Sequence, residues 1–115
     1  MLTLPIKKKW FDMILSGDKK EEYREIKPYY STRFNKTEFT GCFEVLFRNG
    51  YSGQARSLEV ACSLDIGEGR PEWGAESGVR YYRLHIREIT AVHNIPISVD
   101  TDGFGLNGTS DQDPR

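Results

Sequence analysis

The densest group of residues able to do chemistry lies at positions 17–24, which read Gly-Asp-Lys-Lys-Glu-Glu-Tyr-Arg. Glu22 and Arg24 are two residues apart, so in a strand their side chains point to the same face. Lys19 has the opposite parity, but it lies at the turn into the strand, where alternation does not apply. Arginine offers a planar fork of donors and lysine a point charge, so the three could hold a phosphate or a base edge. Glu22 could accept from an exocyclic amine or act as a general base.

The same residues also allow a plainer interpretation, in which Glu22 and Arg24 form an ordinary ion pair on a solvated strand. Three lysines just upstream of the cluster also allow two interpretations, a ligand contact or an ordinary solvated surface. Lys7, Lys8 and Lys9 lie where a helix should begin, and positive charge there is mildly unfavourable to the helix dipole. Lys7 could therefore face the same cleft and bind ligand, or the three could form a solvated basic helix start.

Aromatic residues flank the cluster and could stack on bases. Trp10 falls on an apolar helical stripe, which favours core packing, while Tyr23 lies within the cluster. Trp73 lies in the glycine-rich segment 67–78, where a large aromatic has less reason to belong to the core. It could be a stacking platform or lid over the cleft and bind substrate, or a plug over the end of the fold.

Apolar spacing predicts the elements that position these residues. Trp10, Met13 and Ile14 follow a helical period that ends before Gly17, so we expect a helix over residues 8–16. Pro28 can occupy the first position of a short second helix over residues 29–34. Turn residues on either side of 19–26 indicate a short strand, and residues 2–6 read as another.

The middle of the chain is predicted to be β. Residues 43–48, 58–66 and 79–92 alternate apolar and polar side chains over long runs. Long antiparallel strands with few helices favour an α+β class and a small barrel of about five to six strands, with one N-terminal helix and one short helix.

The pattern Gly-x-Lys-x-x-Glu-x-Arg, here Gly17, Lys19, Glu22 and Arg24, directly follows the predicted amphipathic helix. It resembles the signature of the ASCH domain, a branch of the PUA-like superfamily. Residues 4–7 resemble that family's first strand, and residues 81–86 resemble its last barrel strand. The resemblance covers roughly residues 2–93, so we expect an ASCH domain at 1–95 and an acidic, Gly- and Asp-rich tail, flexible or loosely docked, at 96–115.

The resemblance implies a cleft that recognises RNA or a nucleotide, lined by Lys7, Lys19, Glu22, Arg24 and Trp73. It also implies an alternative, since some ASCH proteins are amidohydrolases acting on N4-acetylcytidine and ribonuclease activity is associated with the family. Lys19 matches the catalytic lysine of the amidohydrolase type. Glu22 stands where that type has a threonine, so as a catalytic residue it would have to activate water instead. The second acidic residue could be Glu68, Glu72 or Glu76.

The histidines, the cysteines and a row of basic side chains bear on which other kinds of site the chain could contain. Arg83, His85 and Arg87 share a strand face, which could be a basic ladder for phosphate but more often is the solvent face of a strand. His85 and His93 have no ligand set beside them, so we expect no metal site and no cofactor. Cys42 and Cys62 do not read as a disulfide or a nucleophile.

Composition allows a nucleic-acid ligand although the net charge of the 115 residues is -1. Residues 7–36 carry nine basic and five acidic side chains, whereas the segment 98–115 is acidic. A basic region therefore remains available to a nucleic-acid ligand, while the near-neutral total favours a small ligand or a short single strand over long, salt-driven binding. No apolar run approaches the ~20 residues of a membrane span and the N-terminus lacks a signal-peptide core, so we expect a soluble, cytoplasmic protein without a membrane partner.

Overall fold

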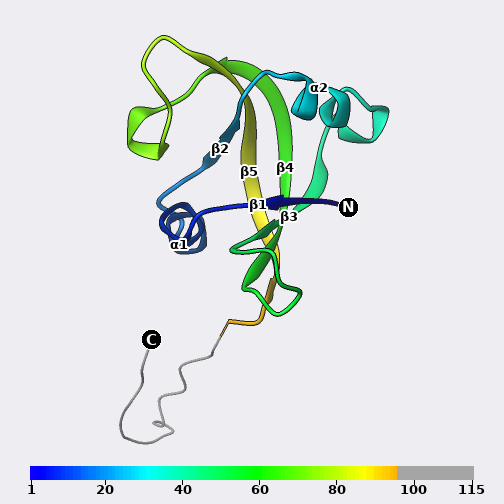
Figure 1. Cartoon of the computed structure of the whole chain (residues 1–115), viewed down its shortest axis with the longest axis vertical. Helices are drawn as coiled ribbons and strands as arrows, with labels where there is room; N and C mark the ends of the chain where they lie inside the picture. The colour runs from blue at the N-terminus through cyan, green and yellow to red at the C-terminus, as the bar shows by residue number, and fades with distance from the viewer. Residues whose placement is uncertain (96–115) are drawn as a thin grey trace, which may run out of the picture.

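Five strands, two α-helices and two short 3₁₀ helices make up the part of the chain that the computed structural model describes, residues 1–95 (Figure 1). The predicted acidic tail at 96–115 lies outside the described residues. The elements follow in the order β1 (Leu2–Pro5), α1 (Lys8–Ser16), β2 (Glu21–Arg24), α2 (Pro28–Phe34), η1 (Thr37–Phe39), β3 (Phe43–Arg48), β4 (Ser57–Glu68), η2 (Pro71–Trp73) and β5 (Arg80–His93).

The strands form one mixed sheet in the order β1-β3-β4-β5-β2. β1 pairs parallel with β3, and every other neighbouring pair is antiparallel. The predicted α+β class is confirmed. The expected closure into a barrel is not seen in residues 1–95, where β1 and β2 form the two edges and do not pair with each other. Both edge strands are only four residues long, and Pro5 has no amide proton to offer a neighbour.

A side chain joins the two edges of the sheet where the backbone does not. Arg24 Nη2, on β2, donates to the carbonyl oxygen of Pro5, on β1, over 2.7 Å. The sheet is therefore curled enough for one guanidinium group to span its edges.

The hydrophobic core fills the inner face of this curled sheet. Strands β3, β4 and β5 supply its centre, α1 adds Phe11 and Ile14, and α2 adds Phe34. Glu22 lies opposite Leu84 on β5, and Leu84 is fully buried in this core. Residues opposite one another in antiparallel strands share a face, so the carboxylate of Glu22 points into the interior.

The two helices begin and end where the sequence indicates. α1 spans the predicted residues, and Gly17 ends it in a left-handed conformation (φ 90°) from which its N–H donates to Ile14 O. The first turn of an α-helix tolerates proline, and Pro28 is the first residue of α2. Within residues 1–95 no helix has the length and apolar character that crossing a bilayer requires.

Candidate functional site

Lys19 is drawn into the interior by the turn between α1 and β2. Its backbone N–H donates to Met13 O over 3.0 Å, which folds the turn back against the helix. The ammonium group donates to Glu21 O over 2.6 Å and to Trp73 O over 2.8 Å, and lies 3.3 Å from Glu22 Oε1. The side chain is 0% exposed, and its ammonium group is engaged by two hydrogen bonds and one ion pair.

Two aromatic rings enclose the same ammonium group. Lys19 Nζ lies 5.0 Å from the centre of the Trp10 ring and 4.9 Å from that of Tyr23. Both distances are within the range of a cation–π contact. Burial lowers the pKa of Lys19, and the carboxylate of Glu22 opposes that shift.

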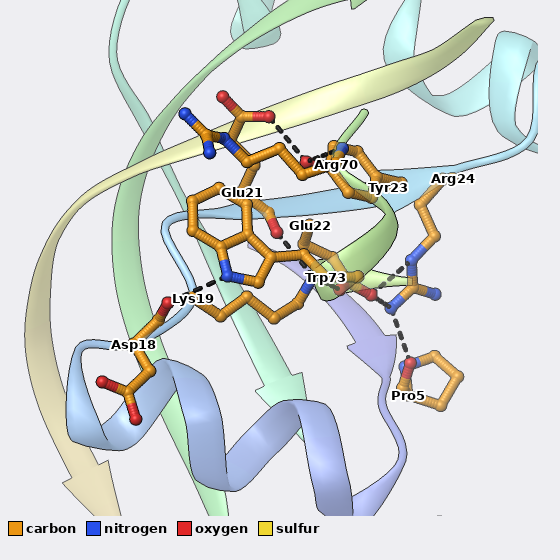
Figure 2. Close-up of polar contacts among 9 residues, drawn as sticks. All are labelled: Pro5, Asp18, Lys19, Glu21, Glu22, Tyr23, Arg24, Arg70 and Trp73. Carbon is orange, nitrogen blue, oxygen red and sulfur yellow. Dashed lines mark hydrogen bonds and ion pairs between the residues drawn. The ribbon is translucent and has the colours of Figure 1, made fainter. Parts of the chain in front are cut away.

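Glu22 lies between Lys19 and Arg24 and completes a charged cluster that we call the buried triad (Figure 2). Glu22 Oε2 accepts from Arg24 Nη2 over 2.7 Å and from Arg24 Nε over 3.2 Å. Arg24 Nη1 donates to the Tyr30 hydroxyl over 3.2 Å. Burial alone would lower the pKa of Arg24, but the charge of Glu22 and the contacts with Tyr30 together outweigh it, so the pKa is raised.

The loop that contains η2 covers Lys19. Trp73 is half-buried, and its indole Nε1 donates to Asp18 O over 2.9 Å while its own carbonyl accepts from Lys19 (Figure 2). The Tyr23 hydroxyl accepts from Arg70 N over 2.9 Å and donates to Glu21 Oε1 over 2.7 Å. These bonds, made by Arg70 and by Trp73 itself, hold Trp73 over the ammonium group.

An open cavity of about 220 Å³ reaches two members of the buried triad, Glu22 and Arg24. Its walls include the start of α1 and the inner face of β2, and its lining residues are Pro5, Ile6, Lys7, Trp10, Glu22, Tyr23 and Arg24. A neighbouring cavity of about 370 Å³ shares Pro5, Ile6 and Lys7 with it and extends to Asn49, Gly50 and Tyr51. We call the two together the twin cavity.

The structure thus brings three of the five predicted ligand-binding residues to one cavity. Lys7 is exposed and stands between the two halves of the twin cavity, while Glu22 and Arg24 form part of its floor. Lys19 lies behind Glu22, and neither Lys19 nor Trp73 lines the cavity. Trp10 packs partly against the core and also forms a wall.

The chain was compared with models of protein families, with curated proteins and with solved structures. None of them matches it. The resemblance to the ASCH family therefore rests on the motif from Gly17 to Arg24 and on the elements around it.

Sequence reasoning missed a second charged cluster, on the outer face of β4 and β5. Arg83 donates to both carboxylate oxygens of Asp65 over 2.7 and 2.8 Å, and these bonds hold the pKa of Asp65 down to about 2. His85 Nε2 lies 2.9 Å from Asp65 Oδ1, and His85 Nδ1 lies 3.4 Å from Glu21 Oε2. Two members of the predicted basic row, Arg83 and His85, thus face carboxylates, whereas Arg87 donates to the Ser63 hydroxyl over 2.8 Å. Only the strand register could have shown these pairings.

The remaining predictions concern possible metal ligands and the two cysteines. No group of three or more His, Cys, Asp or Glu side chains in that range is arranged to hold a metal ion. Cys42 is an exposed free thiol and Cys62 a buried one.

Proposed function

We propose that the protein binds RNA or a nucleotide through the twin cavity, as a member of the ASCH family with an open rather than closed sheet. The observation that carries the proposal is the meeting of Lys7, at the start of α1, with Glu22 and Arg24, on β2, at one cavity. A lysine at the rim and a carboxylate–guanidinium pair at the floor offer both partners that a nucleotide needs, a cation for phosphate and a polar edge for the base.

The two halves of the cavity suit a short ligand. Lys7 stands between them, so its ammonium group can meet a phosphate while a base enters the half floored by Glu22 and Arg24. Trp10 and Tyr23 supply aromatic surface in that half, and Tyr51, which is 87% exposed, lies in the other. Stacking on such rings does not depend on base identity.

The geometry favours binding over hydrolysis. A catalytic group must come within hydrogen-bond reach of the bond it breaks. Lys19 is enclosed, and its ammonium group already makes two hydrogen bonds and an ion pair, so in this arrangement it positions Glu22 rather than touching a ligand. Glu22 in turn accepts two bonds from Arg24 through one of its oxygens.

The test is a binding titration with short single-stranded RNA and with cytidine nucleotides at low salt, monitored by chemical shifts of backbone amides. We expect the largest shifts in residues 5–10 and 22–24, and we expect Lys7→Ala to weaken binding about tenfold, as loss of a charge-assisted contact should. Lys36→Ala, which removes an exposed lysine just before η1, is the matched control and should leave binding unchanged.

Two results would contradict the proposal. If neither RNA nor nucleotide gives saturable shifts at these residues, the twin cavity does not serve this purpose. If incubation with N4-acetylcytidine releases cytidine, and Lys19→Ala abolishes the release, the protein is a hydrolase and the positioning role given to Lys19 is wrong.

A further inference from the structure

A cavity of about 580 Å³ lies on the face of the sheet opposite the core. Leu46 and Arg48 of β3 line it, and they alternate with the fully buried Val45 and Phe47, which point the other way. The remaining lining residues come from β1, β4, β5 and the loop after β3: Met1, Thr3, Gly53, Ser57, Glu59, Val92, His93 and Asn94. This cavity shares no lining residue with the twin cavity.

Three hydrogen-bond donors stand in one row across its wall. Arg48 on β3 is registered opposite Ser57 on β4, and Ser57 is registered opposite His93 on β5. Directly opposed residues in antiparallel strands project from the same face with their Cβ atoms about 4.5–5.5 Å apart. A guanidinium group, a hydroxyl group and an imidazole ring are therefore neighbours on this wall.

Arg48 has no partner among the residues that the structure describes. Its Nε is shielded from solvent and donates to no acceptor, and its side chain forms no ion pair within residues 1–95. The guanidinium of Arg24, by contrast, is bonded to a carboxylate, a carbonyl and a hydroxyl. A half-buried cation without a counterion is a position that an anion entering the cavity would stabilise.

The surroundings of the row are held in place. His93 Nε2 lies 2.6 Å from Glu59 Oε2, which fixes the imidazole ring beside Ser57. Asn94 adopts the left-handed conformation (φ 59°), and its side-chain amide donates to Ala55 O over 3.2 Å. That bond ties the end of β5 to the loop between β3 and β4, at the same end of the sheet (Figure 1).

We propose that this cavity binds a small molecule through its phosphate group, with Arg48, Ser57 and His93 as the anion-binding residues. A phosphate group has enough oxygens to accept from Arg48, from Ser57 and from His93 Nδ1 at once, since His93 Nε2 already meets Glu59. A carboxylate has only two oxygens for these three donors. The volume exceeds that of an inorganic ion and falls in the range of sites for small organic ligands. Glu59 limits the affinity, because its carboxylate repels the anion.

The test is a titration of the full chain with inorganic phosphate, glycerol phosphate and acetate, monitored by chemical shifts of the backbone amides and of the Arg48 Nε–H. Both phosphates should give saturable shifts at Arg48, Ser57 and His93, glycerol phosphate with the higher affinity, and acetate should be at least about tenfold weaker. Arg48→Gln should weaken phosphate binding about tenfold or more.

Two further variants separate a built site from general surface attraction. Glu59→Gln removes the repelling carboxylate and should tighten phosphate binding several-fold. Arg87→Gln, which removes an exposed guanidinium elsewhere on β5, should change nothing. Equal binding of acetate and phosphate, an equal loss in Arg87→Gln, or shifts confined to the twin cavity would each overturn the proposal. Arg48→Gln should leave RNA or nucleotide binding at the twin cavity intact, so the two proposals fail separately.

Discussion

Replacing Glu22 with glutamine should destabilise the protein strongly, although it only exchanges one carboxylate oxygen for an amide nitrogen. Glu22 is 6% exposed and is the one carboxylate within ion-pair distance of both Lys19 and Arg24 among residues 1–95. The substitution keeps the shape of the side chain but leaves two buried cations beside each other. We therefore expect the fold to lose stability while the surrounding packing stays the same.

The size of the loss follows from the burial of the partners. The side chains of Lys19 and Arg24 are 0% and 10% exposed, so solvent cannot replace the lost charge. Removing one partner of a buried ion pair costs about 3–5 kcal/mol. Glutamine can still accept one bond from Arg24, which places Glu22→Gln at the lower end, about 3 kcal/mol. A domain of this size has roughly 5–15 kcal/mol in total, so the variant should fold but unfold early.

The pH dependence of the loss gives a second, sharper test. A lysine whose pKa is lowered in the folded state penalises folding below that pKa, and the penalty disappears as pH rises past the unfolded value of 10.5. In Glu22→Gln the opposing effect of the carboxylate is gone, so the pKa of Lys19 falls further. The deficit in free energy of unfolding should therefore shrink as pH is raised from about 7 to about 10.

Urea unfolding of wild type and variant, followed by circular dichroism at several pH values, measures both effects. The matched control is Glu25→Gln, which breaks an ion pair with Lys27 whose side chains are 68% and 50% exposed. It should leave the unfolding midpoint almost unchanged. A deficit below about 1 kcal/mol for Glu22→Gln, or one that does not change with pH, would refute the account of a buried triad.

The remaining predictions concern a thiol and a glycine. In the native protein a thiol reagent should modify the exposed Cys42 quickly and Cys62 only after unfolding. The reason is that Cys62 is buried, and burial raises the pKa of its thiol to about 12. Equal rates of modification for both thiols in the native protein would contradict this. Gly74→Ala should lower the free energy of unfolding by about 1–3 kcal/mol, since Gly74 has φ 102° and a Cβ there would lie 2.9 Å from Trp10 Cζ2. Gly53→Ala, where a Cβ would meet nothing within 4 Å, is its control in the same thermal melt and should be near neutral.

Secondary structure could be predicted from the sequence because local signals dominate it here. The helical period before Gly17 locates α1, Pro28 locates the start of α2, and long alternation locates β3, β4 and β5. What the sequence could not provide is which strand pairs with which. The parallel pairing of β1 with β3 joins residues more than forty positions apart, and no local pattern encodes it.

In the candidate site, too, local spacing was predictable from the sequence and long-range contacts were not. Spacing alone placed Glu22 and Arg24 on one face of a strand, and the register confirms it. The enclosure of Lys19 depends on the carbonyl of Trp73, which is 54 positions away. The row of Arg48, Ser57 and His93 likewise exists only through the pairing of three strands. Charged residues that look independent in sequence can be neutralised or left unpaired by such long-range contacts.

The order of strands has a consequence for how the chain folds during synthesis. β4 and β5 form one long antiparallel pair, and β1 and β2, although made first by the ribosome, occupy the two outer edges of the finished sheet. The partner of β2 is β5, so residues 21–24 have no strand to pair with until residues 82–85 have emerged. β1 can pair with β3 once residues 45–48 have emerged, so it is β2 that must wait as an unpaired segment until β5 is made. The hydrogen bond from Arg24 to the carbonyl oxygen of Pro5 can form only at the end of assembly, once β2 has paired with β5.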